Sequence, residues 1–308
     1  MSVQVSDRNG TLIPINFLQF SGGERHVQIA ESVMATLTGT LNVQARMQSS
    51  DDIIDYLLLE SVLFDRGLSV NLEIPYFPYA RQDRACAVGQ AFSLEMMTRL
   101  LNVNTSIKTN HLRGTITVWD CHSPVTTALL TANTHFNPVI NISPVEIIQQ
   151  CPALVSLLMS HDSVLICPDH GAKNRTASIA DYFNQHRSSP LSIVYCDKKR
   201  DPTTGKILNA QVNADDLSGK TAIITDDICD GGATFIGIAQ ALRRLNCDNI
   251  ILYVTHGIFS RGLEVFTGLI DHIFTSNSFL QQNPTEYQTQ SQTRLTVIPF
   301  TTNLGASS

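Results

Sequence analysis

Acidic and small residues are concentrated in one short stretch of the chain. The apolar run 222–224 is typical of a buried parallel strand, and Asp226 and Asp227 stand where that strand is expected to end. The segment that follows consists of Asp230, Gly231, Gly232, Ala233 and Thr234. Apolar residues then recur on one helical face over 235–245. Glycine lets backbone N–H groups approach an anion, and a helix N-terminus adds unpaired donors, so we call residues 230–234 the phosphate loop.

The two acids beside this loop need a function of their own, because carboxylates repel phosphate. Asp226 and Asp227 can accept hydrogen bonds from the two hydroxyls of a ribose, or they can hold a divalent cation. The chain has no Gly-x-x-x-x-Gly-Lys-Ser/Thr segment, and the loop lacks Gly-x-Gly-x-x-Gly spacing, so two common nucleotide motifs are excluded. An ordinary strand-to-helix turn with solvated acids is the alternative. A strand end of an open α/β sheet favours a ligand site.

Two further groups of residues can handle phosphate chemistry. His122 and Asp169 follow two other apolar strands, and such a pair can share Mg²⁺ with phosphates and water, although each can equally be a structural hydrogen bonder. Lys198, Lys199 and Arg200 form a basic run. Beside a phosphate loop, such cations stabilise charge on a transferring phosphoryl group; a solvated turn is the alternative.

An aromatic segment with two prolines, residues 75–84, carries Arg81 and Gln82. These side chains can clamp the base and phosphates of a nucleotide, or they can belong to a packed surface turn. His256 can belong to a site, or it can equally be a core histidine with its hydrogen bonds satisfied. The sequence shows no Ser-His-Asp signature, zinc-ligand spacing or Gly-x-Ser-x-Gly motif.

Strands and helices are expected to alternate along the chain, which favours parallel sheets with crossover helices. The expected strands lie within 12–29 and at 70–74, 115–119, 163–167, 191–196, 222–224, 250–254 and 295–300. The expected helices cover 51–66, 93–101, 145–159, 175–184 and a segment from 235 onward. The first of these helices is expected to be capped by Ser49 or Ser50, to end at Gly67, and to face inward with Ile53, Ile54, Leu57 and Leu58. Two similar α/β domains, each a mainly parallel sheet flanked by helices, are the simplest architecture.

Composition narrows the class of protein. A chain of 308 residues with 43% hydrophobic and 16% charged residues suits a globular protein of two domains. The net charge of -6 argues against a nucleic-acid binder. The N-terminus does not read as a secretory signal, and no apolar stretch approaches the length of a membrane span. The seven cysteines never form Cys-x-x-Cys, so we expect reduced thiols and a cytoplasmic location.

Taken together, these segments resemble the ribose-phosphate pyrophosphokinases, also called phosphoribosyl pyrophosphate synthetases, over almost the whole chain. The most specific similarity is Ile-Pro-Tyr-Phe-Pro-Tyr-Ala-Arg-Gln-Asp-Arg at residues 74–84. The other similar segments, in the family's order, are Phe20–Glu24 with 27–29, Asp120–His122, Pro168–Arg175, Asp197–Arg200, the phosphate loop and Thr255–Gly257.

The resemblance implies two phosphoribosyltransferase-like domains, residues 1–141 and 142–293, with 294–308 returning to the first. It implies transfer of the β,γ-diphosphoryl group of ATP to the C1 hydroxyl of ribose 5-phosphate, with release of AMP. The implied ATP contacts are Phe20, Glu24, Arg81, Gln82 and His122. The implied ribose-phosphate contacts are Asp226, Asp227, Asp230, Gly231, Gly232, Ala233 and Thr234. Mg²⁺ would lie near His122 and Asp169, Lys198 and Arg200 would be catalytic, and the enzyme would be a homo-oligomer, a dimer or hexamer.

Three departures from the family pattern affect these expectations. Gly22 stands where the family has Asp or Asn, which removes a base contact, and residues 85–90 lack the family's basic stretch, which bears on subunit contacts and regulation. The phosphate loop has lost one hydroxyl donor and gained space. A larger acceptor, ADP-ribose, is therefore a second hypothesis, with ADP-ribose pyrophosphate for NAD resynthesis as its product.

Two other classes of protein explain the sequence less completely than a synthetase does. A catalytically silent regulatory subunit has no chemical reason to keep Lys198, Arg200, His122 and Asp169 together. A purine-type phosphoribosyltransferase explains the acid pair and the loop, but it leaves the segment 79–83 unexplained.

Overall fold

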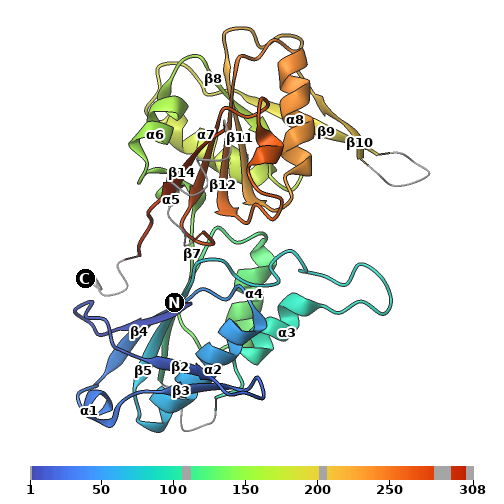
Figure 1. Ribbon diagram of the computed structural model, residues 1–308. Helices are drawn as coiled ribbons and strands as arrows, with labels where there is room; N and C mark the ends of the chain where they lie inside the picture. The colour runs from blue at the N-terminus through green and yellow to red at the C-terminus, as the bar shows by residue number, and fades with distance from the viewer. Residues whose placement is uncertain (1, 106–111, 201–206, 281–292, 303–308) are drawn as a thin grey trace. The chain divides into compact units, whose positions relative to one another are not determined.

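The computed structural model of the chain describes residues 2–105, 112–200, 207–280 and 293–302. These residues form two compact units: residues 1–142 with the chain end from Thr301, and Ser143–Phe300. Each unit contains a mainly parallel sheet flanked by helices (Figure 1). The α/β fold class predicted from the alternation of strands and helices is therefore confirmed. In the described part of the chain, no helix is both long enough and apolar enough to cross a membrane.

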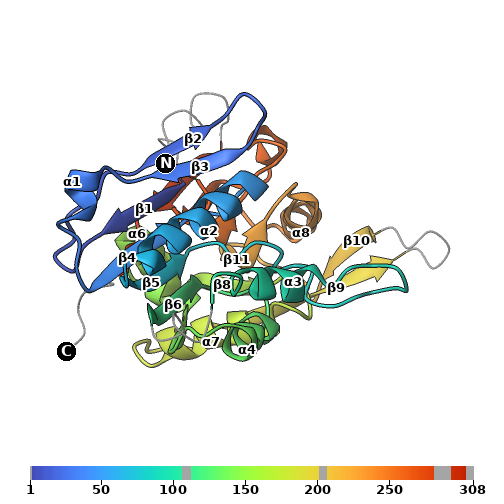
Figure 2. The same cartoon turned by 90° about the horizontal axis from the view of Figure 1, so that it is seen from below.

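The first unit is built on a five-stranded sheet in the order β1-β4-β5-β6-β7, in which β1 is antiparallel to β4 and the other pairs are parallel. The strands are β1 (Val3–Ser6), β4 (Thr40–Ala45), β5 (Ser69–Ile74), β6 (Arg113–Trp119) and β7 (Val139–Ile142), with the hairpin β2 (Asn16–Gln19) and β3 (Arg25–Gln28) beside them. The helices are α1 (Glu31–Met34), α2 (Ser50–Asp65), α3 (Ser93–Leu100) and α4 (Pro124–Asn133). Figure 2 shows the hairpin running alongside α2, where Arg25 forms an ion pair with Asp55.

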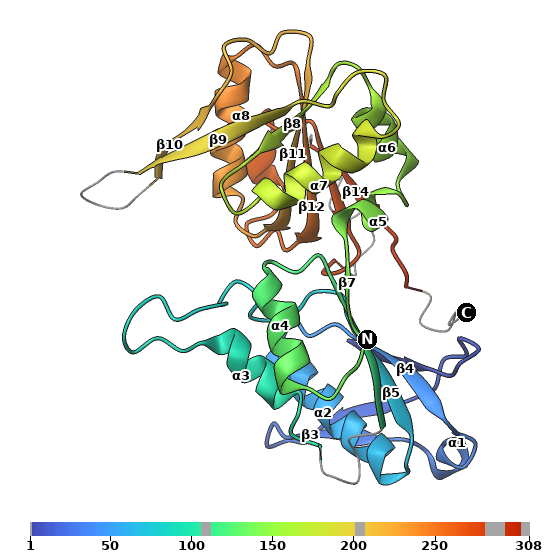
Figure 3. The same ribbon diagram turned by 180° about the vertical axis from the view of Figure 1, so that it is seen from behind.

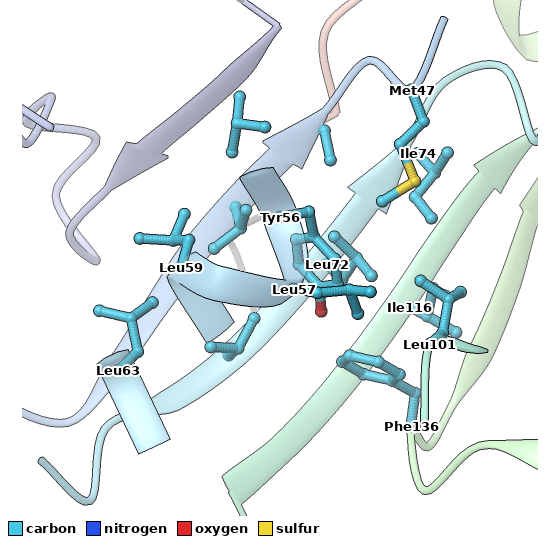
Figure 4. Packing of buried hydrophobic residues seen from close by; sticks show 14 of the residues in the cluster. Met47, Tyr56, Leu57, Leu59, Leu63, Leu72, Ile74, Leu101, Ile116 and Phe136 are labelled. Carbon is cyan, nitrogen blue, oxygen red and sulfur yellow. The ribbon is translucent and has the colours of Figure 1, made fainter. Parts of the chain in front are cut away.

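Helix α2 organises the core of the first unit. Ser49 caps it in a capping box with Asp52, which satisfies two backbone donors of the first turn, and Gly67 takes a φ of 69° just beyond its end. Figure 4 shows its apolar side chains packed against the sheet, where β5 is among its neighbours. The labelled residues are Met47, Tyr56, Leu57, Leu59, Leu63, Leu72, Ile74, Leu101, Ile116 and Phe136. Each large apolar side chain buried in this way contributes ~2 kcal/mol of stability.

Polar groups are also buried inside this unit. Arg113 and Glu60 form a fully buried ion pair, with one Nη2–Oε2 distance of 2.7 Å and an Nε–Oε1 distance of 3.1 Å. Tyr56 donates a hydrogen bond to the same carboxylate, and Arg113 also lies over the ring of Phe136. Charges are tolerated in a core when they are paired and hydrogen-bonded in this manner.

The second unit contains a seven-stranded sheet in the order β10-β9-β8-β11-β12-β13-β14, in which β10 is antiparallel to β9 and the remaining pairs are parallel. The strands are β8 (Ser163–Cys167), β9 (Ile193–Arg200), β10 (Ile207–Val212), β11 (Thr221–Cys229), β12 (Asn249–Gly257), β13 (His272–Ser276) and β14 (Arg294–Ile298). The helices are α5 (Pro144–Ile148), α6 (Pro152–Met159), α7 (Lys173–Asn184), α8 (Ala233–Arg244) and the short 3₁₀ helix η2 (Glu264–Phe266). Helix α8 lies in front of the sheet in Figure 1 and α7 in front of it in Figure 3, so they cover opposite faces.

Three sequence expectations differ from this structure. Strand β14 pairs in parallel with β13 in the second sheet, so the expected return of 294–308 to the first domain does not hold for residues 294–298. The single helix expected over 145–159 is divided into α5 and α6, because Pro152 lacks a backbone N–H and begins the second helix. Ile54, expected to face inward, is 41% exposed.

Candidate functional site

The acid pair lies just beyond the point where the pairing of β11 with β8 ends in the second sheet. Strand β11 pairs with β8 from Thr221 to Ile224, but its pairing with β12 continues to Cys229. The expectation that the strand ends before the acids is therefore wrong, since Asp226 and Asp227 lie inside β11. In the described part of the chain, no ladder with β8 covers this stretch of β11. Ligands of open parallel sheets bind at such carboxyl ends of strands.

One cation serves both acids. Arg175, on α7, places Nη1 3.7 Å from Asp226 Oδ1 and 3.6 Å from Asp227 Oδ1. The backbone N–H of Asp227 also donates to Asp226 Oδ1 at 2.9 Å. Arg175 is the last residue of the segment Pro168–Arg175, which resembles the family, but no function is predicted for it from the sequence. Its position shows that α7 supplies the charge that partly neutralises the acid pair.

The acid pair is electrostatically unusual. Burial raises the pKa of the Asp226 carboxyl well above its ordinary value, the neighbouring Asp227 charge adds to this shift, and Arg175 acts in the opposite direction. Two carboxylates held together out of water disfavour the doubly ionised state. Such a pair gains from a ligand that donates hydrogen bonds or brings positive charge. The two neighbouring hydroxyls of a sugar, or a metal ion, have the required chemistry.

The phosphate loop is shaped by Gly232. This residue is the N-cap of α8 and has a φ of 77°, a left-handed conformation that favours glycine. A Cβ at this position would lie 2.5 Å from Cζ of Phe266, so the ring occupies the space that a side chain would need. The loop therefore turns sharply into α8, where Ala233 and Thr234 begin the first turn. The unpaired N–H groups of that turn are the donors that an anion requires.

A second loop supports the phosphate loop. It joins β12 to β13, and its residues 258–266 are called the β12 loop below. Ile258 and Phe259 donate their backbone N–H groups to the carbonyl of Cys229, at 2.9 and 3.1 Å. Ser260 Oγ donates to Asp230 Oδ1 at 2.6 Å. No local pattern in the sequence indicates this support, because it joins positions 30 residues apart.

Asp169 has a defined local role in the structure. It follows β8, and its Oδ1 accepts hydrogen bonds from the backbone N–H groups of Gly171 at 2.9 Å and Ala172 at 3.2 Å. These bonds fix the turn from β8 into α7, the helix that carries Arg175. Asp169 is half-buried at the same edge of the sheet as the acid pair.

Two cysteines of the second unit, Cys167 at the end of β8 and Cys229 at the end of β11, lie at this edge but are not reactive. Burial raises the pKa of Cys229 to about 12, with the nearby carboxylates Asp226 and Asp230 adding to the shift. Burial likewise raises the pKa of Cys167. A thiolate is the nucleophilic form of cysteine, so these residues remain neutral and do not act as nucleophiles at neutral pH. All seven cysteines are free thiols, as expected.

In the first unit, three of the predicted nucleotide contacts line one hollow. Arg81, Gln82 and His122 surround a space of about 400 Å³. Its other lining residues are Asp83, Arg84, Cys86, Gln90, Ala91 and Ser93. Arg81 and Gln82 were predicted to act as a clamp, and the approach of His122 to them was not predictable from spacing, because His122 follows Gln82 by 40 residues. Two arginines beside a hollow of this size suit a polyphosphate.

The other predicted residues lie elsewhere. Phe20 and Glu24 belong to the turn of the β2-β3 hairpin, where the Phe20 N–H donates to the Glu24 carbonyl at 2.9 Å, and neither is among the described residues lining the hollow. Lys198 and Arg200 lie near the end of β9, antiparallel to β10, but their side chains fall outside the described part of the chain. Residues 201–206 and 281–292 also lie outside it. His256 is a buried core histidine whose Nδ1 lies 2.8 Å from Ser278 Oγ.

The two residues proposed for magnesium differ in donor chemistry: Asp169 offers the carboxylate oxygens that Mg²⁺ prefers, and His122 offers an imidazole nitrogen. His122 is exposed in the first unit, and Asp169 is half-buried in the second. Among the described residues there is no cluster of three or more His, Cys, Asp or Glu side chains able to hold a metal ion. Mg²⁺ usually takes one or two carboxylates and completes its coordination with water and substrate phosphates.

Together, a parallel sheet, an acid pair at its carboxyl edge and a glycine-containing helix N-terminus define a site of the phosphoribosyltransferase class. A family model described as the phosphoribosyl transferase domain matches residues 146–273, and one described as the N-terminal domain of ribose phosphate pyrophosphokinase matches residues 3–104. The chain belongs to the ribose-phosphate pyrophosphokinase family.

Individual relatives agree with this assignment. The chain is 26% identical over 305 residues to the ribose-phosphate pyrophosphokinase of Pyrococcus abyssi, covering 97% of this chain and 92% of the relative. It is 25% identical over 279 residues to the enzyme of the same name from Thermococcus kodakarensis, covering 89% of each. A crystal structure of phosphoribosylpyrophosphate synthetase from Mycobacterium smegmatis has the same fold, with a TM-score of 0.71 at 20% identity over 94% of this chain and 87% of that one.

Proposed function

We propose that this chain is an ATP-dependent diphosphotransferase. It moves the β,γ-diphosphoryl group of ATP to the C1 hydroxyl of a ribose 5-phosphate moiety, and it releases AMP. With ribose 5-phosphate as acceptor, the product is phosphoribosyl pyrophosphate. Membership of the ribose-phosphate pyrophosphokinase family supports this activity, as do the names of its relatives.

One observation carries the proposal for the acceptor: the acid pair directly precedes the phosphate loop. Asp226 and Asp227 lie four and three residues before Asp230 on a single strand and turn. Carboxylates accept hydrogen bonds from hydroxyls, and the amides at the start of α8 donate to a phosphate. A molecule with two neighbouring hydroxyls on a small ring and a phosphate attached to that ring through one methylene satisfies both groups at once. Ribose 5-phosphate is such a molecule.

The residues of the chain then have distinct roles. The acid pair orients the ribose through its hydroxyls, and Arg175 keeps the pair from repelling the phosphates. Arg81, Gln82 and His122 bind ATP, and Phe20 and Glu24 add further nucleotide contacts. Phosphoryl transfer needs little covalent participation from the protein, so positioning and charge stabilisation supply the rate.

Two cations and one metal ion complete the proposed chemistry. Lys198 and Arg200 stabilise the charge that spreads over the transferred group. His122 and Asp169 would each offer a ligand for Mg²⁺, which would neutralise charge on the ATP phosphates when bound.

A second acceptor, ADP-ribose, is favoured by the composition of the phosphate loop. Gly231, Gly232 and Ala233 carry no hydroxyl, which leaves Thr234 as the loop's hydroxyl donor. A phosphomonoester has three terminal oxygens to satisfy, whereas the ribose-side phosphate of ADP-ribose, joined to the next phosphate by an anhydride oxygen, has two. A loop with fewer donors therefore suits this bridged phosphate better. The same chemistry on ADP-ribose gives ADP-ribose pyrophosphate, a compound suited to NAD resynthesis.

The remaining parts of the proposal concern assembly and location. We expect a homo-oligomer, a dimer or a hexamer, which light scattering after size-exclusion chromatography will show. A cytoplasmic location is proposed because free thiols persist in a reducing compartment. The retained His122 and Asp169 argue against the third possibility, a catalytically silent subunit.

The test is an acceptor assay that follows AMP release. The purified chain is incubated with ATP, Mg²⁺ and either ribose 5-phosphate or ADP-ribose, with a no-acceptor control. The proposal predicts AMP in proportion to acceptor consumed for at least one of the two. Absence of acceptor-dependent AMP with both would refute the activity.

A matched pair of variants tests the role of the acid pair. Asp226→Asn is expected to weaken acceptor binding by ~10- to 100-fold, since a hydrogen bond to a charged group is lost. Asp181→Asn makes the same chemical change at an exposed position on α7 and is expected to have no effect. Equal behaviour of the two variants would show that the acids do not bind the acceptor.

A further inference from the structure

The β12 loop is held firmly against the phosphate loop. Two backbone N–H groups, those of Ile258 and Phe259, converge on the carbonyl of Cys229, and Ser260 Oγ donates to Asp230 Oδ1 at 2.6 Å. Phe259 has a φ of 47°, in the left-handed region that bulky residues rarely adopt. These contacts fix the position of the next residue, Arg261, relative to the phosphate loop.

Arg261 lies along the open side of Gly231. A Cβ on Gly231 would lie 3.4 Å from Arg261 Nε and 3.5 Å from its Cδ, so the side chain runs over the backbone of the phosphate loop. Arg261 is exposed. In residues 2–105, 112–200, 207–280 and 293–302, its guanidinium has no hydrogen bond or ion pair. An arginine that supported the fold would be expected to bind a carboxylate or carbonyl.

We propose that Arg261 selects the acceptor by binding a second phosphate, one attached beyond the 5′-phosphate of the ribose. This inference rests on the proposed function, and it names the acceptor class: a ribose 5-phosphate extended by another phosphate, as in ADP-ribose. Guanidinium groups bind phosphate oxygens through two parallel hydrogen bonds, which gives both affinity and orientation.

The order of residues along the loop assigns Arg261 to the second phosphate rather than the first. The amides that suit the 5′-phosphate belong to the first turn of α8, which begins at Ala233 after the N-cap Gly232. Arg261 packs against Gly231, one residue before that N-cap and outside the helix. Ribose 5-phosphate has no group beyond its phosphate to reach this position, whereas ADP-ribose has a phosphate one bridging oxygen further on.

The experiment measures equilibrium binding of ADP-ribose and of ribose 5-phosphate by titration calorimetry, without ATP. Arg261→Ala is expected to weaken ADP-ribose binding by ~10- to 100-fold, the range for losing a charge-assisted hydrogen bond, and to leave ribose 5-phosphate binding within ~3-fold. Arg261→Lys keeps the positive charge but cannot form the two parallel hydrogen bonds of a guanidinium, so its ADP-ribose affinity is expected to lie between those of the wild type and Arg261→Ala. Arg244→Ala removes the same charge from the far end of α8 and is expected to change neither affinity.

Each other result has a defined meaning. An equal loss for both ligands would overturn the inference, because Arg261 would then bind the shared 5′-phosphate; an unchanged ADP-ribose affinity, or a wild-type chain that binds ribose 5-phosphate alone, would overturn it too. A chain that binds neither ligand would refute the proposed function itself. If Arg261→Ala selectively lost ADP-ribose binding but the wild-type chain released no AMP in the acceptor assay, the role of Arg261 would be supported and the proposed reaction refuted.

Discussion

Replacing Gly232 by alanine tests the shape of the phosphate loop most strictly. Its φ of 77° costs an L-residue roughly 1–2 kcal/mol relative to glycine. The new Cβ would also lie 2.5 Å from Cζ and 2.8 Å from Cε1 of Phe266, and overpacking of this kind typically costs ~1–3 kcal/mol. The sum predicts that Gly232→Ala destabilises the second unit by ~2–5 kcal/mol.

Gly231→Ala is the matched control for this substitution. Gly231 does not have a left-handed φ, and its added Cβ meets the flexible side chain of Arg261 at an ordinary 3.4 Å. We expect a change of less than ~0.5 kcal/mol, the usual range for surface positions. The double variant Gly232→Ala, Phe266→Leu is expected to recover part of the loss, because a smaller side chain relieves the overlap.

The assay is thermal unfolding of both single variants and the double variant by circular dichroism. At this size a loss of 1 kcal/mol lowers the Tm by roughly 2–4 °C, so Gly232→Ala is expected to lower it by at least ~4 °C. If Gly232→Ala and Gly231→Ala melted at the same temperature, the packing of Phe266 against Gly232 would not constrain the loop.

Three further predictions concern charged groups. Burial raises the pKa of Asp226 and the charge of Asp227 raises it further, so acceptor binding should weaken on acidification at a pH above the ordinary 3.8. Asp227→Asn should shift this acid-side decrease in acceptor affinity to lower pH in binding titrations. An unshifted decrease would contradict the coupling of the two acids. Burial raises the pKa of Glu73 above 4.5, so the folded state keeps a proton that the unfolded chain releases, and stability should fall as pH rises above 4.5. Glu73→Gln should flatten that slope in Tm-against-pH profiles and raise the Tm at neutral pH, whereas a slope as steep as the wild type's would count against Glu73 as its source. Arg113→Met leaves Glu60 charged and buried and should cost ~3–5 kcal/mol in urea unfolding, with much of it recovered when Glu60→Met is added; a loss below ~1 kcal/mol would mean that the pair is not buried as described.

Local signals in the sequence predicted helices α2, α3, α7 and α8 and most strands, but not helix α4 or strands β1, β4, β7, β10 and β13. The serine cap and Gly67 set the bounds of α2 to within a residue or two, because capping is a short-range interaction. The same sequence misplaced Ile54, which is exposed, while the polar Asp55 and Glu60 are buried. Their partners, Arg25 and Arg113, lie 30 and 53 residues away, and helical periodicity carries no information about such partners.

The candidate site was predictable in its residue types but not in its geometry. The acids and glycines of β11 and its loop were apparent, but the end of β11 was not, since it depends on how far β8 and β12 extend beside it. Similarly, the apolar pattern of 295–298 predicted a strand but not its sheet, which the pairing of β14 with β13 decides. Arg261 was missed for the same reason: its position depends on contacts between two loops 30 residues apart.

The most direct test of the central claim is a ³¹P NMR spectrum of the reaction with ATP, Mg²⁺ and each acceptor. The account predicts AMP together with two coupled phosphorus signals of a diphosphate on C1 of the ribose, for ribose 5-phosphate, ADP-ribose or both. A spectrum showing ADP and an acceptor that has gained a single phosphoryl group would contradict it, and so would unchanged ATP with both acceptors.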